Sequence, residues 1–426
     1  MKGKIALRLL SKRGERIPGL ALLVVLCICS LVGSGVSGSV AQGCTITVSA
    51  GSSIQEAVDA APAGAVVCLA PGTWEENIVV KKALTLRGVG PDKSVINGLD
   101  WNEPVILIAA ETEIKVTIES LTITLPNGIE LSGSAQARII NSTVFEIELS
   151  SLSWAEITSS TVENSIRLLN SARAKIADST ISGGYGIELS DSAQVRIVNS
   201  TVSGIELSGF SGVEIASSTI EKGIRLLNSA QAKITGSTIS KNGEYSIKLS
   251  GSAQARIVNS TVSRIELSSF SGVEIASSTV EGSISLSDSA QAKIADSTRG
   301  YGVELSGSAQ VRITNSTLSW IGLSGLSWVE IASSTVENSI RLSDSAQAKI
   351  TDSTISKNGG YGVELSGSAQ ARIINSTFSR IELSGFSWAE IAGSTIETTI
   401  GDGIKLSDSA QIEVTTSIII KKKHID

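Results

Sequence analysis

Most of this chain is an internal repeat, and no other feature of the sequence limits the possible folds so strongly. The phrase I-x-L, with Val in place of Ile in two copies and usually followed by Ser, recurs fifteen times from residue 129 onward at spacings of 18 to 23 residues. We number each copy, or coil, from position 0 at the first residue of this phrase. The coils are of three kinds that follow one another in a fixed order, so that the sequence also repeats every three coils, as a triplet. The coils begin at Ile129, Ile147, Ile166, Ile187, Ile205, Ile224, Ile247, Ile265, Ile284, Val303, Ile321, Ile340, Val363, Ile381 and Ile404.

Within a coil, apolar residues alternate with polar ones. Positions 0, 2, 8, 10 and 15 are apolar in nearly every coil, and position 2 is leucine in all fifteen. A period of two indicates strands that bury one face. The 300 residues after Pro126 contain no proline, which suits continuous sheet because proline removes a ladder hydrogen bond. We predict an all-β fold, a single-stranded right-handed parallel β-helix (β-solenoid), with like residues stacked about 4.8 Å apart in a rod of about 70 Å.

A second pattern marks one corner of each coil. Position 13 is serine in every coil, and position 12 is mostly Asn, Asp, Ser or Gly, residue types that favour tight turns. We therefore predict a left-handed corner lined by a ladder of hydroxyl groups. Five corners also read Asn-Ser-Thr, the N-glycosylation acceptor pattern, although a conformational requirement explains them more simply. These are Asn141, Asn199, Asn259, Asn315 and Asn375.

Charged residues form two files along the array. Position 1 mostly repeats Glu-Glu-Arg, and position 9 mostly repeats Arg-Glu-Lys. We expect exposed ion-pair ladders worth a few tenths of a kcal/mol per pair, with a charged binding face as the alternative. The formal net charge of the whole chain is -6, which gives no electrostatic reason to expect nucleic acid or an anionic membrane as a partner.

The middle coil of each triplet carries an apolar residue at position 5 and, in three triplets, a tryptophan at position 7. Because position 7 alternates with buried positions, these side chains should form a line of apolar platforms about 14 Å apart that could stack on sugars or meet a partner protein. Packing of position 5 against its neighbours at the turn is the alternative. The candidate binding residues are Trp154, Phe210, Phe270, Trp328, Phe386 and Trp388, flanked by Leu152 and Leu326 at position 5. All four tyrosines, Tyr185, Tyr245, Tyr301 and Tyr361, share the variable turn that ends the third coil.

The N-terminal end reads as an export signal. Residues 1–41 combine a basic stretch, a short apolar run from Gly19 to Gly33 and a small-residue cleavage site at 39–41, so we expect a secreted, periplasmic or cell-surface protein. An uncleaved anchor is the alternative, and we expect no transmembrane segment in the mature chain. In an oxidising compartment Cys44 and Cys68 can form a disulfide, although lipidation of Cys44 is a second reading.

The segment before the repeats should cap the solenoid. Ser53-Ile54-Gln55-Glu56 has the pattern of a capping box and opens a short amphipathic helix that ends near Ala60, which can cover the open apolar end. First strands are expected at 66–69, 77–80 and 84–86. We divide the chain into the signal (1–41), the cap and first coils (42–128), the regular coils (129–420) and a C-terminal tail (421–426).

Residues 46–98, with the run SSIQEAVDAAPAGAVVCLAPGTWEENIVVKKALTLRGVGPDKSVING, resemble the opening of pectin-lyase-like right-handed β-helix proteins, especially pectin methylesterases and NosD-like periplasmic proteins. The resemblance implies the fold and little chemistry. The Asp-Phe-Ile-Phe-Gly and Gln-Asp-Thr-Leu stretches of the methylesterases are absent here, as are the Gly-His-Gly and Asn-Thr-Asp of polygalacturonases. No catalytic residue of the family can therefore be placed on this chain.

The residue types needed for catalysis or metal binding are not gathered by the repeat. Aspartates that share a coil are far apart on extended chain, those that share a column are several coils apart, and the only histidine is His424. We predict no catalytic residues, no metal and no cofactor, and a structural, adhesive or binding role with a polysaccharide or a surface protein as partner. The alternative is a carbohydrate-active enzyme (lyase, hydrolase or esterase) with a site near Asp100, Trp101 and Glu103.

Overall fold

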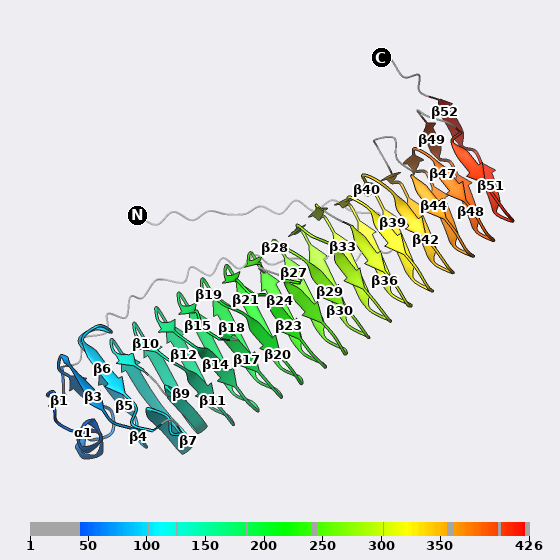
Figure 1. Ribbon diagram of the computed structural model, residues 1–426. Helices are drawn as coiled ribbons and strands as arrows, with labels where there is room; N and C mark the ends of the chain where they lie inside the picture. Colours follow the sequence, from blue (N-terminus) through cyan, green and yellow to red (C-terminus); the bar gives the residue numbers. More distant parts are fainter. Residues whose placement is uncertain are drawn as a thin grey trace, which may run out of the picture. The chain divides into compact units, whose positions relative to one another are not determined.

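The repeat folds as a stack of parallel coils (Figure 1). The computed structural model describes residues 43–100, 102–124, 127–184, 186–240, 245–300, 302–355, 362–398 and 402–421. The predicted signal (1–41) and all of the predicted tail beyond residue 421 lie outside these residues, so both remain predictions.

Each regular coil contains three strands, which we call the first, second and third strands. The first strand covers positions 0 to 2, the second covers positions 7 to 11, and the third covers positions 14 and 15. In the first coil, one continuous strand, β9 (Ile129–Ile140), supplies the first two and β10 (Thr143–Val144) the third. The next coils follow as β11 (Ile147–Leu149), β12 (Trp154–Thr158) and β13 (Thr161–Val162), then β14 (Ser165–Leu168), β15 (Arg173–Ala177) and β16 (Thr180–Ile181), and so on to β50 (Ile404–Leu406), β51 (Gln411–Thr415) and β52 (Ile418–Lys421).

Successive coils pair in register, as the repeat predicts. Leu149 of β11 lies opposite Leu131 of the preceding coil and Leu168 of the following one, and all of these pairings are parallel. The side chains at positions 0, 2, 8, 10 and 15 point inward, and in the first coil all five are fully buried. The predicted right-handed parallel β-helix is thus confirmed, with a core made of files of like aliphatic residues.

The predicted corner is present in every regular coil. Position 12 has a positive φ between 48° and 59° in all fifteen coils, and the serine that follows it points into the stack. Ser160 is typical: its hydroxyl donates to the carbonyl of Thr158 at 2.9 Å and accepts the N–H of Ser142 from the preceding coil at 3.2 Å. The buried serine ladder therefore satisfies backbone groups that the left-handed turn removes from the sheet.

A short helix covers the N-terminal end of the stack. Helix α1 (Ile54–Ala60) begins after Ser53, whose hydroxyl accepts the N–H of Glu56, and its residues Ile54 and Val58 are buried. The carboxylate of Glu76 accepts hydrogen bonds from the hydroxyl of Ser53 at 2.6 Å and from the N–H groups of residues 54 and 55 at 2.8 and 3.0 Å. The predicted capping helix is confirmed, and a carboxylate from the first coils anchors it.

The first coils are less regular than the later ones. They comprise strands β1 (Ile46–Val48), β2 (Ala65–Leu69), β3 (Gly72–Glu75), β4 (Ile78–Val80), β5 (Leu84–Arg87), β6 (Ser94–Asn97), β7 (Ile106–Glu119) and β8 (Thr122–Ile123). Strand β7 runs through what is a turn in later coils, because it pairs with the equally continuous β9 with a register shift between Ala110 and Ile114. The predicted strands at 66–69, 77–80 and 84–86 correspond to β2, β4 and β5.

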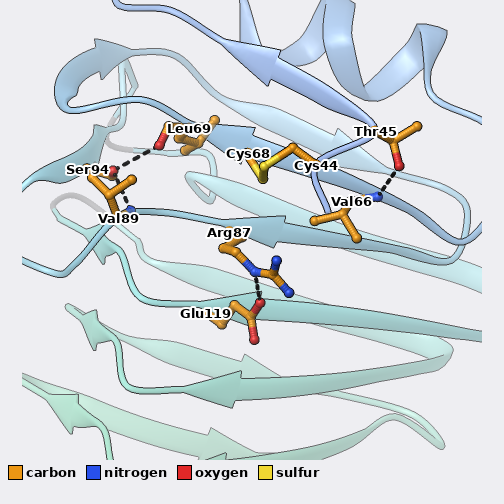
Figure 2. Close-up of a disulfide and its surroundings, with 9 residues drawn as sticks. All are labelled: Cys44, Thr45, Val66, Cys68, Leu69, Arg87, Val89, Ser94 and Glu119. Atoms are coloured by element: carbon orange, nitrogen blue, oxygen red, sulfur yellow. Dashed lines mark hydrogen bonds and ion pairs between the residues drawn. A yellow bond between two sulfur atoms is a disulfide. The ribbon is translucent and has the colours of Figure 1, made fainter. Parts of the chain in front are cut away.

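A disulfide joins Cys44 to Cys68 at the start of the stack (Figure 2). It ties the segment entering β1 to β2, where the side chain of Thr45 also accepts the N–H of Val66 at 3.1 Å. Below it in the same view, Arg87 and Glu119 form an ion pair between β5 and β7. The predicted disulfide is therefore present. No helix among the described residues is long and apolar enough to cross a membrane.

Candidate binding surface

The position-5 side chains of the middle coils project into solvent, and we call them the apex ridge. Their exposed fractions lie between 69% and 76%, whereas the leucines at position 2 of the same coils are at most 3% exposed. The alternative in which position 5 packs against neighbouring residues is therefore wrong. The apex ridge consists of Leu152, Phe210, Phe270, Leu326 and Phe386.

The backbone of the turn explains why this side chain points outward. Position 4 of each middle coil has a positive φ, between 61° and 70°, which turns the chain sharply before position 5. The N–H of position 5 then donates to the position-4 carbonyl of the preceding coil, as from Phe270 to Gly251 at 2.9 Å. The next residue, Ser271, is fully buried. Since inward and outward positions alternate, position 5 is held outside the core.

The tryptophans at position 7 lie beside this ridge, at the start of the second strands. Trp154, Trp328 and Trp388 are half-buried, and the residue after each is fully buried, so their rings lie on the outer face of β12, β39 (Trp328–Ala332) and β48 (Trp388–Ala392). In the other middle coils, position 7 is glycine and position 5 is phenylalanine. Each middle coil therefore presents at least one large aromatic ring near the apex, at position 5 or at position 7.

The two glycine-containing coils leave a shallow groove of about 1120 Å³ on the second-strand face, between Trp154 and Trp328. Gly212 opens β21 (Gly212–Ala216) and Gly272 opens β30 (Gly272–Ala276). A Cβ on Gly212 would lie 2.5 Å from Oε1 of Gln194, so that the glutamine amide occupies the space a side chain would take. The sequence did not predict this groove, although the replacement of tryptophan by glycine at position 7 is its signal.

The second-strand face carries the position-9 residues, which we call the basic file. Glu156 contacts two cations, Arg138 at 3.2 Å and Lys175 at 2.8 Å, and Glu214 and Glu330 each contact two in the same way. The hydrogen bond from Lys175 lowers the pKa of Glu156 below its ordinary value of 4.5. The predicted ion-pair ladder is therefore present, with these three glutamates each shared by an arginine and a lysine, while Glu274 and Glu390 each contact one arginine.

The first-strand face carries the position-1 residues, which we call the acidic file. Here the sharing is reversed, because Arg167 lies 3.9 Å from a carboxylate oxygen of Glu148 and 3.6 Å from one of Glu188. Burial, followed by repulsion from Glu130, raises the pKa of Glu148 above 4.5. The pKa of Glu148 in the acidic file and the pKa of Glu156 in the basic file are thus shifted in opposite directions by their surroundings.

A second trough crosses the acidic file where small residues replace charged ones. It is lined by Ser285, Gly322 and the carboxylates of Glu304 and Glu364, with the indole of Trp320 on its wall. That ring leaves no room for a Cβ at Gly302, where the distance would be 2.4 Å, and only a tight 3.0 Å for one at Gly322. Sequence reasoning missed Trp320 because it stands at a coil junction, outside the repeated positions.

The remaining candidate residues do not gather into a site. The carboxylate of Asp100 accepts bonds from the backbone and side chain of Asn102 on the surface, and Glu103 is exposed. Tyr245 contacts Arg264 and Lys248, with its ring centre 5.1 and 5.8 Å from their cationic groups. Across the described part of the chain, no group of three His, Cys, Asp or Glu residues could hold a metal ion. Trp101, Tyr185, Tyr301, Tyr361 and His424 lie outside the described residues.

Comparisons with known proteins agree with this architecture. A family model described as "Right handed beta helix region" matches residues 105–319, 222–380 and 284–424. No curated protein matches the chain.

Three solved structures are similar over most of their length. The A-module of mannuronan C-5 epimerase AlgE6 from Azotobacter vinelandii is 12% identical, with 87% of this chain and 95% of that chain covered and a TM-score of 0.23. The PL6 family alginate lyase AlyGC is 10% identical, with 83% and 80% covered and a TM-score of 0.26. The A-module of the Azotobacter vinelandii epimerase AlgE4 is 15% identical, with 87% and 93% covered and a TM-score of 0.20. Similarity at this level carries no argument about activity.

Proposed function

This chain belongs to the right-handed β-helix family, and from that premise we propose that it is a secreted or cell-surface scaffold whose apex ridge and adjoining tryptophans bind a polysaccharide or a partner protein. The scaffold part of the proposal rests on the predicted export signal and on the single continuous stack of coils. The binding part rests on the ridge. The disulfide between Cys44 and Cys68 suits an oxidising compartment outside the cytosol.

The exposure of the apex ridge is the observation that carries this proposal. Five large apolar side chains are more than two thirds exposed at the same turn, while the inward-pointing apolar residues of the strands beside them are completely or nearly buried. Covering such a side chain contributes about 1.5–3 kcal/mol, so there is a driving force for a ligand to occupy the ridge. Aromatic rings near the apex can also stack on the apolar faces of sugar rings.

The spacing of the ridge favours an extended ligand. Equivalent residues recur every three coils, about 14 Å apart, so that one polymer or one long partner surface can meet several of them at once. Linked weak contacts of this kind raise the overall affinity far above that of one contact. A compact small molecule would meet only one ridge residue and the tryptophan or glycine beside it.

Substitution along the ridge tests the proposal. A triple variant, Phe210→Ser, Phe270→Ser and Phe386→Ser, adopts the serine that the other coils carry at position 5, so it should fold normally. A second variant carries Trp328→Ala and Trp388→Ala. Binding to a glycan array and to immobilised pectin, alginate, chitin and cellulose would be compared with that of a control, Ser229→Ala, in a third coil.

We expect the wild-type protein and the control to bind at least one of these polymers, or a surface extract of the producing cells. The ridge and tryptophan variants should bind at least tenfold more weakly. Equal binding by all four proteins would refute a role for the ridge. Turnover of pectin or alginate by the wild-type protein, abolished by Asp100→Ala, would instead show that the chain is an enzyme.

A further inference from the structure

The charged files on two outer faces of the solenoid carry opposite net charges. The acidic file contains eight glutamates and five basic residues, and the basic file contains nine basic residues and six glutamates. All of these residues lie in the described part of the chain, and in every coil but the last the side chains that flank them are buried. Eight negative and five positive charges give the acidic file a formal net charge of -3, and nine positive and six negative charges give the basic file a formal net charge of +3.

Sharing within each file leaves charge uncompensated. On the second-strand face, one glutamate such as Glu156 serves two cations, and on the first-strand face, one cation such as Arg167 serves two glutamates. Aspartates at position 4 also border the second-strand face at the turn, where their carboxylates accept backbone N–H groups of the preceding coil. Asp288, for example, accepts the N–H of Ser269 from the preceding coil at 2.9 Å. In the acidic file the first, second and fifth triplets each carry one excess negative charge, and in the basic file the first four triplets each carry one excess positive charge. Glu413 reverses the sign of the basic file in the fifth triplet.

The order of the charges makes the two files complementary to one another. The acidic file mostly repeats Glu-Glu-Arg and the basic file Arg-Glu-Lys. Two three-coil repeats can be aligned side by side in three registers, and in one of these registers every coil of the repeat faces a coil of opposite charge. Each of the other two registers places like charges together in two coils of three. The same holds when one rod is reversed, because the reversed basic file also has one fully complementary register.

Only a partner with the same period can use this complementarity over many coils. Opposite charges stay aligned only if the partner repeats every coil, about 4.8 Å, and changes sign in the same three-coil order. A second copy of this chain has both properties by construction. A partner without this period would match the file at one or two coils and then fall out of register.

We propose that the solenoid associates side by side with further copies of itself, the acidic file of one copy lying against the basic file of the next in the fully complementary register. Each copy then keeps one face of each sign free, so the contact is heterologous and continues as a row of aligned rods. Three positions depart from the acidic repeat, namely Lys248, Ser285 and Gly322. All lie in or near the coils of the first-strand trough, so this stretch contributes least to the contact and the flanking coils most.

The proposal is tested with the purified protein by sedimentation velocity and light scattering at 20 mM and 500 mM NaCl. Screening is strong at the higher salt concentration, so we expect the weight-average mass at 100 µM protein to be at least twofold above that of the monomer at 20 mM and to return to it at 500 mM. A protein that remains monomeric at both salt concentrations would overturn the proposal.

Charge reversal identifies the faces. Variant A reverses part of the basic file with Lys175→Glu, Lys233→Glu, Lys293→Glu and Lys349→Glu. Variant B reverses part of the acidic file with Glu148→Lys, Glu206→Lys, Glu304→Lys and Glu382→Lys. Each variant alone should remain monomeric at 20 mM NaCl, because its two faces carry the same sign. An equimolar mixture should associate, since the faces of A are then complementary to those of B.

Two controls keep the result interpretable. Far-UV circular dichroism reports whether A and B retain the β-helix, and association of the mixture would itself require folded faces. The triple serine variant of the apex ridge should associate like the wild-type protein. Self-association that survives in A and B but is lost in the ridge variant would assign the contact to the ridge and sink the proposal. So would a mixture that stays monomeric while both variants are folded.

Discussion

The serine ladder provides the sharpest test of how the coils are held together. Ser237 is 4% exposed, its hydroxyl donates to the carbonyl of Thr235 at 2.8 Å, and it accepts the N–H of Ser218 at 3.2 Å. In Ser237→Ala the carbonyl of Thr235 still accepts the N–H of residue 217, but the N–H of Ser218 loses its acceptor. A buried donor without a partner costs about 1–3 kcal/mol, which is the destabilisation we expect.

The matched control is Ser229→Ala. It makes the same chemical change at a partly exposed turn position of the same coil and should alter the free energy of unfolding by less than about 0.5 kcal/mol. Because a stack of coils can open locally, urea denaturation should be combined with hydrogen exchange of the segment that contains residue 218. We expect exchange there to be about 5- to 150-fold faster in Ser237→Ala. Equal effects of the two substitutions would refute the argument that the ladder satisfies the corner.

Three further predictions concern the cap and the charged files. Reduction of the Cys44–Cys68 disulfide opens a loop with a sequence separation of 24 and should destabilise the N-terminal coils by about 3 kcal/mol, measured as a lower urea midpoint with dithiothreitol. Replacing Glu76 by Gln removes a charge-assisted cap from α1 and should cost about 1–3 kcal/mol, visible as faster exchange over 54–58, while Glu75→Gln should have little effect. Carboxyl NMR titration should place the pKa of Glu156 below 4.5 and that of Glu148 above it. Because the pKa of Glu156 is lowered by folding, its ionised carboxylate stabilises the fold at pH values above 4.5, and this contribution is lost as the pH falls through the pKa of the folded state. A pKa of 4.5 for both groups would contradict the ladder geometry.

Much of the fold could be predicted because each coil repeats the same pattern of apolar and turn-forming residues. Alternation at positions 0, 2, 8 and 10 predicts the first two strands. The serine at position 13, preceded by a residue that tolerates positive φ, predicts the corner. The helix after Ser53 and the Cys44–Cys68 disulfide were also predicted correctly. In each case the decisive contact is local or lies one coil away, so that sequence spacing is enough to identify it.

The features that were not predicted depend on single residues without a counterpart in other coils. Glu76 caps a helix that begins more than twenty residues earlier, and nothing in the pattern around it indicates this role. Trp320 lies at a junction and fills space left by glycines of neighbouring coils. The groove between Trp154 and Trp328 depends on glutamine side chains that fold over glycines, and rotamers of this kind cannot be inferred from spacing.

The vertical stacking of the coils also affects how such a protein can change its length during evolution. The strands of each described coil pair with those of its immediate neighbours, so insertion of one whole triplet lengthens the rod by about 14 Å and creates no new kind of strand pairing. Insertion of one or two coils would instead shift the order of charges and the spacing of the exposed apolar side chains beyond that point. Unequal recombination between the near-identical repeats can therefore produce longer and shorter alleles that all fold. Only those that differ by multiples of three coils keep their surfaces in phase.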